Sequence, residues 1–345
     1  MFSIGTMTRN VSDQVLDFYN VTFKCDILGW VGNCDDQMVR IIKRNTNIDR
    51  VIESINVEEK VEEFKGATLD IEGFQTTQLL PDLNLNIQGD EPTLLQELQA
   101  GRNIIVSTTI REKYKLNVGD TITIKFEKTP RQYTVIGYMD TMNGDGFYGI
   151  VPMKYLKKDA EVKTYSMLYI RAKEGANLQE TCTQLGESLA DLTYADLIPV
   201  EQQAKENEEN NASLMSMISI FAVLAMVIGI VGVINNLMIS FIERRQSMAM
   251  LRSVGMSKWQ VLKMIFIEGL GSGVISAVSG LSGGILACYS LDYVLKGMDL
   301  PIHMEVVPEL FPSYLMGGIL ITVIGSIIPA RGSSKLNIIE AIKYE

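Results

Sequence analysis

The sequence has few of the residues from which catalytic and metal sites are built. Its 345 residues include one histidine, His303, and four cysteines that form no CxxC pair. Zinc and thioredoxin-like sites depend on such pairs. No GxxxxGK(S/T) phosphate loop occurs, so the chain does not bind ATP in the P-loop manner. Because no catalytic constellation stands out either, we expect no enzyme activity, no cofactor and no bound metal.

The N-terminal part also lacks a recognisable signal. Met1 to Trp30 contains no apolar core of about 7–15 residues, which a secretory signal peptide needs. Cys25 and Cys34 could form a disulfide if this segment lies outside the cell, and two unpaired thiols are the other interpretation. The run Asn143–Gly146 is calcium-like in composition but far shorter than an EF-hand loop, so it predicts a turn.

A basic surface, which a nucleic-acid partner requires, is missing as well. The chain carries 31 Lys and Arg against 41 Asp and Glu, a formal net charge of −10. Residues 1–212 hold 22 of the basic and 33 of the acidic residues, a net of −11, and the remainder has a net of +1. The acidic balance therefore belongs to the first segment, and we expect no nucleic-acid partner.

Three stretches almost free of charge reach membrane-spanning length in the C-terminal part. They predict helices at about 213–242, 265–291 and 310–330. A transmembrane helix needs about 20 apolar residues, and a soluble helix is rarely apolar on every face for so long. We therefore expect a multi-pass protein of the cell membrane, with lipid as one of its partners.

Charges beside these stretches predict the orientation, because cytoplasmic loops carry an excess of Lys and Arg. The two basic stretches contain Arg244, Arg245, Arg252, Lys258, Lys263, Arg331, Lys335 and Lys343. Residues 292–309, between the second and third helices, are acidic on balance. We expect 243–268 and 331–345 inside the cell, and residues 1–209 and 292–309 outside it.

Residues 1–199 predict a mixed α+β domain. Four segments have the composition of strands, namely 21–28, 104–107, 121–126 and 133–138. The last two predict a hairpin joined through Thr129 and Pro130. A helix is predicted by the spacing of Leu178, Cys182, Leu185, Leu189 and Leu192. Asn177 can serve as its N-cap, with Glu180 three residues later.

Residues 200–212 are polar, acidic and free of glycine and proline, and they lead directly into the first span. A solvated linker is one interpretation. A stalk helix is the other, because Pro199 suits a helix start. From Glu201 to Ile242, at ~1.5 Å per residue, such a helix would measure roughly 60 Å, against a hydrocarbon core of ~30 Å. We expect this stalk to lift the domain off the membrane.

The stretch 243–262 predicts a short amphipathic element between two spans. Met248, Leu251 and Val254 fall on one side of a helix that Gly255 can end. Ser257 and Gln260 then fit a capping box that opens the next helix. A helix lying on the membrane surface is the plain interpretation, and a docking element for a cytoplasmic partner is the functional one.

Small residues recur at helical spacing in the second span. They let another helix approach closely, and they make a candidate packing face of Gly269, Gly273, Ser276, Gly280 and Gly284.

Three groups of motifs resemble the FtsX/MacB-like ABC transporter permeases. ERR at 243–245 and MLRSVGMS at 250–257 are similar to the coupling segment of that family. IPARGSSKL at 328–336 and IEAIKYE at 339–345 are similar to its C-terminal ending. NVGDT at 117–121 and YTVIG at 133–137 are similar to its outside core domain. The likeness covers most of residues 100–345.

The resemblance implies a MacB-like α+β domain outside the cell, followed by an all-α membrane part with three helices. It implies a separate ABC ATP-binding subunit that pushes the coupling segment, so that the stalk moves the outside domain. An amphiphile such as a lipoprotein, a peptide antibiotic or a lipid-like molecule would be exported or extracted. Contact with the ATP-binding subunit would fall to Arg244, Arg245, Met248, Leu251, Arg252, Val254 and Gly255.

Two departures from the family pattern leave alternatives open. Ser247 stands where the family usually has glutamate, which puts an ion pair to the ATPase in doubt. The family's membrane helix before the outside domain has no counterpart, so the chain is a fragment or works with a second permease half or as a homodimer. The alternative function is a non-transporting, FtsX-like signalling protein that activates a cell-wall hydrolase or a sensor partner.

Overall fold

A computed structural model describes residues 1–75 and 82–334 of the chain. The chain divides into two compact units. The helical unit contains Met1–Asn10, Asn211–Tyr293 and the residues from Met304 onward. The α/β unit contains Val11–Asn210 and Val294–His303. The helices α1 (Phe2–Thr22), α7 (Val200–Glu243) and α9 (Lys258–Gly297) each contribute to both units.

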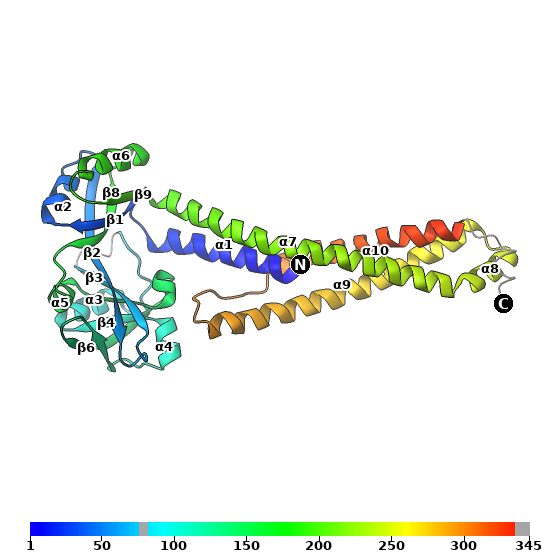
Figure 1. Cartoon of the computed structure of the whole chain (residues 1–345), viewed down its shortest axis with the longest axis horizontal. Coiled ribbons are helices and arrows are strands. Elements are labelled where there is room, and N and C mark those ends of the chain that lie inside the picture. The colour runs from blue at the N-terminus through cyan, green and yellow to red at the C-terminus, as the bar shows by residue number, and fades with distance from the viewer. Residues whose placement is uncertain (76–81, 335–345) are drawn as a thin grey trace. The chain divides into compact units, whose positions relative to one another are not determined.

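The α/β unit contains short helices and strands in a mixed order (Figure 1). Its strands are β1 (Ile27–Cys34), β2 (Ile48–Val61), β3 (Thr68–Phe74), β4 (Asn103–Ser107), β5 (Thr121–Lys125), β6 (Pro130–Met139), β7 (Tyr148–Pro152), β8 (Tyr165–Ala172) and β9 (Ala195–Pro199). Its short helices are α2 (Asp36–Lys43), α3 (Glu91–Ala100), α4 (Thr108–Tyr114), η2 (Asn143–Gly146), α5 (Met153–Asp159) and α6 (Leu178–Leu189).

One long strand, β2, belongs to two parts of the nine-stranded sheet. The sheet order is β3-β7-β4-β6-β5-β2-β8-β1-β9, and β3 also pairs with β2. The first half of β2 pairs with β8, and its second half pairs with β3 up to Lys60. The strands β2, β3, β7, β4, β6 and β5 therefore close into a small barrel, while β2, β8, β1 and β9 continue as an open sheet. We call the closed part the barrel.

Buried carboxylates inside the α/β unit are hydrogen-bonded, as the cost of burying a charge requires. Asp159 accepts from Arg102 Nε and Nη2 at 2.6 and 2.7 Å and from the Tyr133 hydroxyl at 2.8 Å. Glu72 accepts from Ser54, Tyr148 and Tyr169. Both acids lie beside the hydrophobic clusters that fill the unit. Glu72 connects β3 to β2, β7 and β8, and Asp159 connects the end of α5 to Arg102 and β6.

Most of the predicted local structure of this unit is confirmed. The segment 104–107 lies in β4, and β5 and β6 form the predicted hairpin, with Ile122 opposite Tyr133. The Asn177 side chain accepts from the Glu180 N–H at 3.3 Å and caps α6. The run 143–146 is a turn in which Gly144 and Asp145 have positive φ. The thiols of Cys25 and Cys34 are free and buried, so the disulfide is not formed.

The predicted strand at 21–28 is wrong over most of its length. Val21 and Thr22 end α1, and only Ile27 and Leu28 belong to β1. The strand-like composition of this run reflects packing rather than backbone preference. Phe23 is buried against Phe18 and Tyr19, at ring-centroid distances of 5.6 Å for each pair, which the helix of α1 makes possible.

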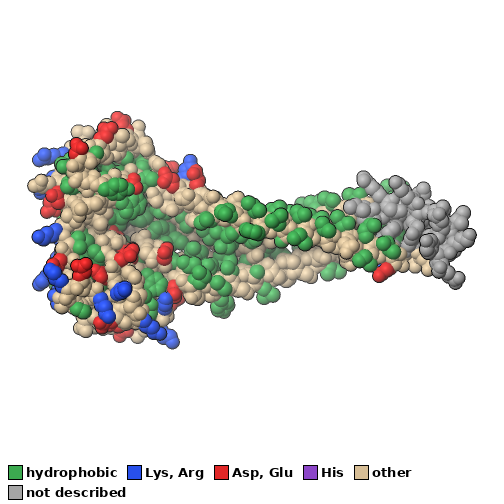
Figure 2. Space-filling view, in the orientation of Figure 1, with side chains coloured by type: hydrophobic (Ala, Val, Ile, Leu, Met, Phe, Trp, Pro, Cys, Tyr) green, Lys and Arg blue, Asp and Glu red, His purple; other side chains and the backbone are tan. Residues whose placement is uncertain are grey.

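The helical unit contains the three long apolar helices. They are α7, α9 (Lys258–Gly297) and α10 (Phe311–Ser334), with α8 (Arg245–Ser253) and η3 (Pro308–Leu310) between them. By length and composition, three segments can cross a membrane: Val200–Ser240, Trp259–Gly297 and Pro308–Ile327. Many hydrophobic and few charged side chains are visible along these helices, whereas charged side chains gather on the α/β unit (Figure 2). The helix α7 runs without interruption through 200–212 into the first span.

Candidate functional site

The segment between the first two spans reverses the chain within a few residues. The helix α7 ends at Glu243, α8 follows from Arg245 to Ser253, and α9 begins at Lys258. Gly255 has a φ of 109°, a conformation that favours glycine. The Ser257 N–H donates to Gln260 Oε1 at 2.8 Å, and the Gln260 N–H donates to Ser257 Oγ at 3.3 Å. The reversal therefore has a left-handed glycine followed by the predicted capping box.

The helix α8 has one face packed against its own unit and one face exposed. Met248 is 4% exposed and Ala249 is fully buried. Leu251 is 42% exposed and Val254 is 88% exposed. Met250 of α8 is exposed, and so is Trp259 at the start of α9, whereas Val254 directly follows α8. A three-residue spacing places Met248 and Leu251 on one side of α8. Their environments nevertheless differ, because the surrounding helices already cover Met248.

An ion pair fixes the start of this segment. Arg244 Nη1 lies 2.7 Å from Glu268 Oε1 of α9, and both side chains are exposed. A shallow hollow beside the pair is lined by Leu237, Ser240, Met248 and Ile265. Arg244 therefore connects α7 to α9 within the chain. Arg245 and Arg252 lie in α8, and their side chains are outside the described part of the structure.

The small residues of α9 divide between two environments. A Cβ added at Gly269 or Gly273 would lie 3.2 Å from the Cβ atoms of Ser326 and Thr322 of α10. A Cβ added at Gly284 would lie 2.9 Å from Phe2 of α1. Ser276 and Gly280 are exposed instead. Three of the five predicted packing positions thus receive a helix of the same chain, and two are left for another molecule or for lipid.

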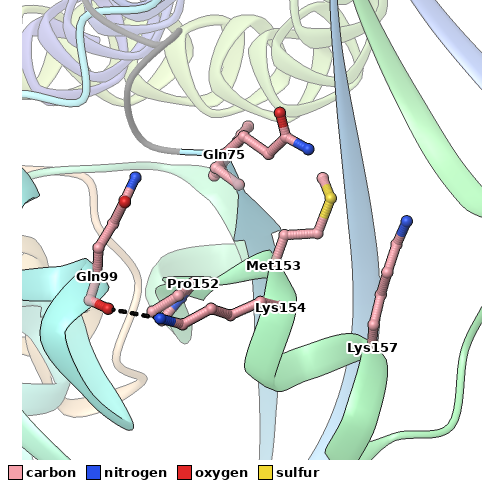
Figure 3. Close-up of a pocket in the computed structure, with 7 residues that line it drawn as sticks. Gln75, Gln99, Pro152, Met153, Lys154 and Lys157 are labelled. Carbon is pink, nitrogen blue, oxygen red and sulfur yellow. Dashed lines mark hydrogen bonds between the residues drawn. The ribbon is translucent and has the colours of Figure 1, made fainter.

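A hollow of about 350 Å³ in the α/β unit is a weaker candidate site (Figure 3). Its lining includes Pro152, Met153 and two lysines, but both ammonium groups already have partners. Lys154 Nζ donates to the Gln99 carbonyl at 3.0 Å, as the dashed line in Figure 3 shows. Lys157 Nζ lies 3.3 Å from the Tyr165 hydroxyl and 4.3 Å from the centre of its ring. These contacts explain the lysines without a ligand.

The described residues contain no group of three or more His, Cys, Asp or Glu side chains that could hold a metal ion. His303 lies in the segment between α9 and α10, where its backbone N–H and carbonyl both bond to the Gln14 side chain. The C-terminal motif at 339–345 lies outside the described residues, and the motif at 328–336 is described only as far as Ser334 in α10.

Comparison with known proteins assigns both units. Residues 1–187 match the family model of the MacB-like periplasmic core domain, and residues 219–338 match that of the FtsX-like permease C-terminal region. The chain belongs to the FtsX/MacB-like ABC transporter permeases. Membership in this family, together with three helices long and apolar enough to cross a membrane, indicates a membrane protein.

Curated relatives agree with this assignment. An uncharacterised ABC transporter permease of Methanocaldococcus jannaschii is 25% identical over 239 residues, which cover 67% of this chain and 59% of the relative. The lipoprotein-releasing system transmembrane protein LolC of Xylella fastidiosa is 21% identical over 127 residues, 32% of this chain and 31% of LolC. The chain thus spans well under two thirds of the length of the curated relatives it matches.

Among solved structures, the periplasmic region of MacB from Actinobacillus actinomycetemcomitans is similar to this permease. It is 11% identical with a TM-score of 0.40, covering 56% of this chain and 98% of that one. The extracellular domain of the transporter YknZ from Gram-positive bacteria is 14% identical with a TM-score of 0.36, covering 50% of this chain and 98% of that one.

Sequence reasoning missed the inward position of Met248 and the pair between Arg244 and Glu268. The two charges are separated by 24 residues, a spacing with no local periodicity to reveal it. Ala249 beside Met248 offered a signal, because a small apolar residue next to a long one suits a contact with another helix.

Proposed function

We propose that this permease couples ATP hydrolysis by a separate ATP-binding subunit to movement of its α/β unit. The movement serves the export or extraction of an amphiphilic substrate. The observation that supports this most directly is the two-sided helix α8, placed between two membrane-spanning helices. One face is anchored through Met248 and Ala249. Exposed apolar side chains lie elsewhere on α8 and directly after it, namely Met250, Leu251, Val254 and Trp259.

The docking surface in this proposal consists of Met250, Leu251, Val254 and Trp259. Burying apolar area is worth about 25 cal/mol per Å², so these four side chains can supply most of the binding energy. Arg245 and Arg252 orient α8 against acidic groups of the partner and set specificity more than affinity. Arg244 and Met248 have a different part, because their contacts inside the chain hold α8 in place.

Movement would reach the α/β unit through α7. At ~1.5 Å per residue, its 44 residues measure roughly 65 Å, which is about twice the ~30 Å hydrocarbon core. An unbroken helix of that length transmits a push or tilt at one end to the other. In this arrangement the α/β unit lies outside the cell and α8 inside, as the basic residues near α8 favour.

Two further elements of the proposal follow from exposure and from the relatives. The exposed Ser276 and Gly280 of α9 suit contact with a second permease half or a second copy of the chain. The LolC relatives are named for lipoprotein release, which makes a lipid-anchored protein the first substrate to test.

The substitution Leu251→Asp tests the docking surface. We expect a tagged full-length chain, purified from the membranes of the cells that naturally make it, to co-purify with a protein that contains a GxxxxGK(S/T) loop. A carboxylate within an apolar contact costs on the order of 2–4 kcal/mol, so recovery should fall at least ~10-fold. Leu192→Asp is the matched control, because Leu192 is 50% exposed in the α/β unit, and it should leave recovery unchanged.

Undiminished recovery with Leu251→Asp would contradict docking through α8. A chain that recovers only a cell-wall hydrolase or a sensor kinase, with no ATP-binding protein, would instead favour the signalling alternative.

A further inference from the structure

Two side-chain amides of α1 bind the backbone between α9 and α10 in the same way. Asn10 Nδ2 donates to the Glu305 carbonyl at 2.8 Å, and the Glu305 N–H donates to Asn10 Oδ1 at 3.2 Å. Gln14 Nε2 donates to the His303 carbonyl at 2.7 Å, and the His303 N–H donates to Gln14 Oε1 at 3.0 Å. Each amide thus satisfies both polar groups of one backbone residue.

The spacing of the two pairs explains why they occur together. Residues four apart on a helix lie on one face, about 5–6 Å from each other. Residues two apart in an extended segment are separated by about 6.6 Å and direct their backbone groups to the same side. Asn10 and Gln14 are related in the first way, and His303 and Glu305 in the second. The side chains on this face of α1 therefore bind the backbone of His303 and Glu305 as a neighbouring β-strand would.

The residue between them is held from the opposite side. The Met304 N–H donates to Asp292 Oδ1 of α9 at 3.0 Å, and the Met304 side chain is buried. Consecutive N–H groups of an extended segment alternate in direction. All three N–H groups of 303–305 thus bind side chains. We call Asn10, Gln14 and Asp292 the clamp, and residues 298–307 the connector.

The connector also holds the barrel. Asp299 forms an ion pair with Lys113 at the end of α4. Pro301 approaches Gly146 of η2, where an added Cβ would lie 3.3 Å from the proline ring. Gly146 has a φ of 84° and no side chain, so it leaves room for this contact. Both contacts lie within the α/β unit, and the chain itself joins the connector to α9 and α10.

We propose that the clamp fixes the connector along α1. The clamped connector is then a third attachment of the α/β unit, beside α1 and α7, and through it α9 and α10 act on the barrel. The amides of Asn10 and Gln14 suit this role because each binds one backbone residue on both its donor and its acceptor side. The clamp is inferred from its hydrogen bonds alone. Its role in transport rests on the proposed function.

Amide hydrogen exchange of the full-length chain in lipid nanodiscs tests the clamp. Asn10→Leu combined with Gln14→Leu removes all four hydrogen bonds to His303 and Glu305. Amide exchange at these two residues should then rise ~10-fold or more. Asn10→Asp and Gln14→Glu keep the accepting oxygen, so they should retain protection of those two N–H groups. Asn20→Leu, an exposed amide further along α1, is the control. Unchanged exchange in the double leucine variant overturns the clamp.

The third attachment is tested in the complex with the ATP-binding subunit. ATP should change the exchange of residues 103–114 in the unaltered complex, and the double leucine variant should lose at least half of that change. An equal response in both overturns the attachment. Absence of any ATP response in the unaltered complex would count against the proposed function instead. Barrel peptides from β5 and β6 show in each case that the α/β unit is folded.

Discussion

Asp70 and Glu72 lie two residues apart on β3, and so on one face of the strand. Burial raises the pKa of Glu72, whose carboxylate accepts hydrogen bonds from three hydroxyls. Burial, with Glu58 nearby, raises the pKa of Asp70 to about 6. A carboxyl whose folded pKa exceeds its unfolded value binds its proton more tightly when folded. These acids therefore make the fold of the α/β unit depend on pH.

We expect the chain to lose stability as the pH rises from about 4 to above 6. The contribution of the Asp70 proton is complete below its ordinary pKa of 3.8 and is lost as the pH passes about 6. In Asp70→Asn, the free energy of unfolding should fall by about 1–2 kcal/mol less over this pH range than in the unaltered chain. The difference is no larger because the partial exposure of Asp70 lets solvent screen its charge.

Urea unfolding at pH 5 and pH 8 measures this difference. Asp191→Asn, at an exposed carboxyl, is the control. An identical pH dependence in Asp70→Asn and the unaltered chain would contradict the prediction.

At the scale of the elements, a row of small residues on α9 packs against α10. Gly269 and Gly273 lie against Ser326 and Thr322 of α10, and Ala277 lies against Gly318. The approach is close enough that an extra methyl group at Gly273 would be crowded. Packing between α9 and α10 therefore depends on the absence of side chains at these positions.

Gly273→Leu should destabilise the helical unit, because no space exists for the new side chain. Overpacking of this kind costs about 1–3 kcal/mol. Gly280→Leu is the matched control on the same helix, since no described atom lies within 4 Å of a Cβ added there. Thermal unfolding of the purified chain in detergent should show a lower midpoint for Gly273→Leu only. Equal midpoints would mean that α9 and α10 do not depend on this contact.

For the whole molecule, the arrangement of basic residues predicts which parts face the cytoplasm. Lys163 is an exposed residue of the α/β unit, and Ser253 is an exposed residue of α8. A membrane-impermeant thiol reagent added to intact cells should label Lys163→Cys and spare Ser253→Cys. Opening the cells should make Ser253→Cys reactive. The four natural cysteines are buried and provide the background. Labelling of Ser253→Cys alone in intact cells would reverse the proposed orientation.

The sequence alone determined the features that arise from neighbours along the chain. Uncharged length is enough to identify a membrane helix, because the hydrocarbon core tolerates few charges. Capping at Asn177 and at Ser257, and the turn at Gly255, depend on side chains within three residues of the backbone groups they satisfy. The hairpin of β5 and β6 follows from alternation beside a short turn.

Contacts between residues that are far apart in the sequence follow from the folded arrangement of the chain. Periodicity places Met248 and Leu251 on one side of α8, but the neighbouring helices cover only Met248. The pairing of β2 with both β3 and β5, which closes the barrel, has no local signature. The pair of Asn10 with Glu305 spans 295 residues. Such contacts depend on how whole helices and strands pack together, and the free energy of that packing cannot be predicted from any short segment of the sequence.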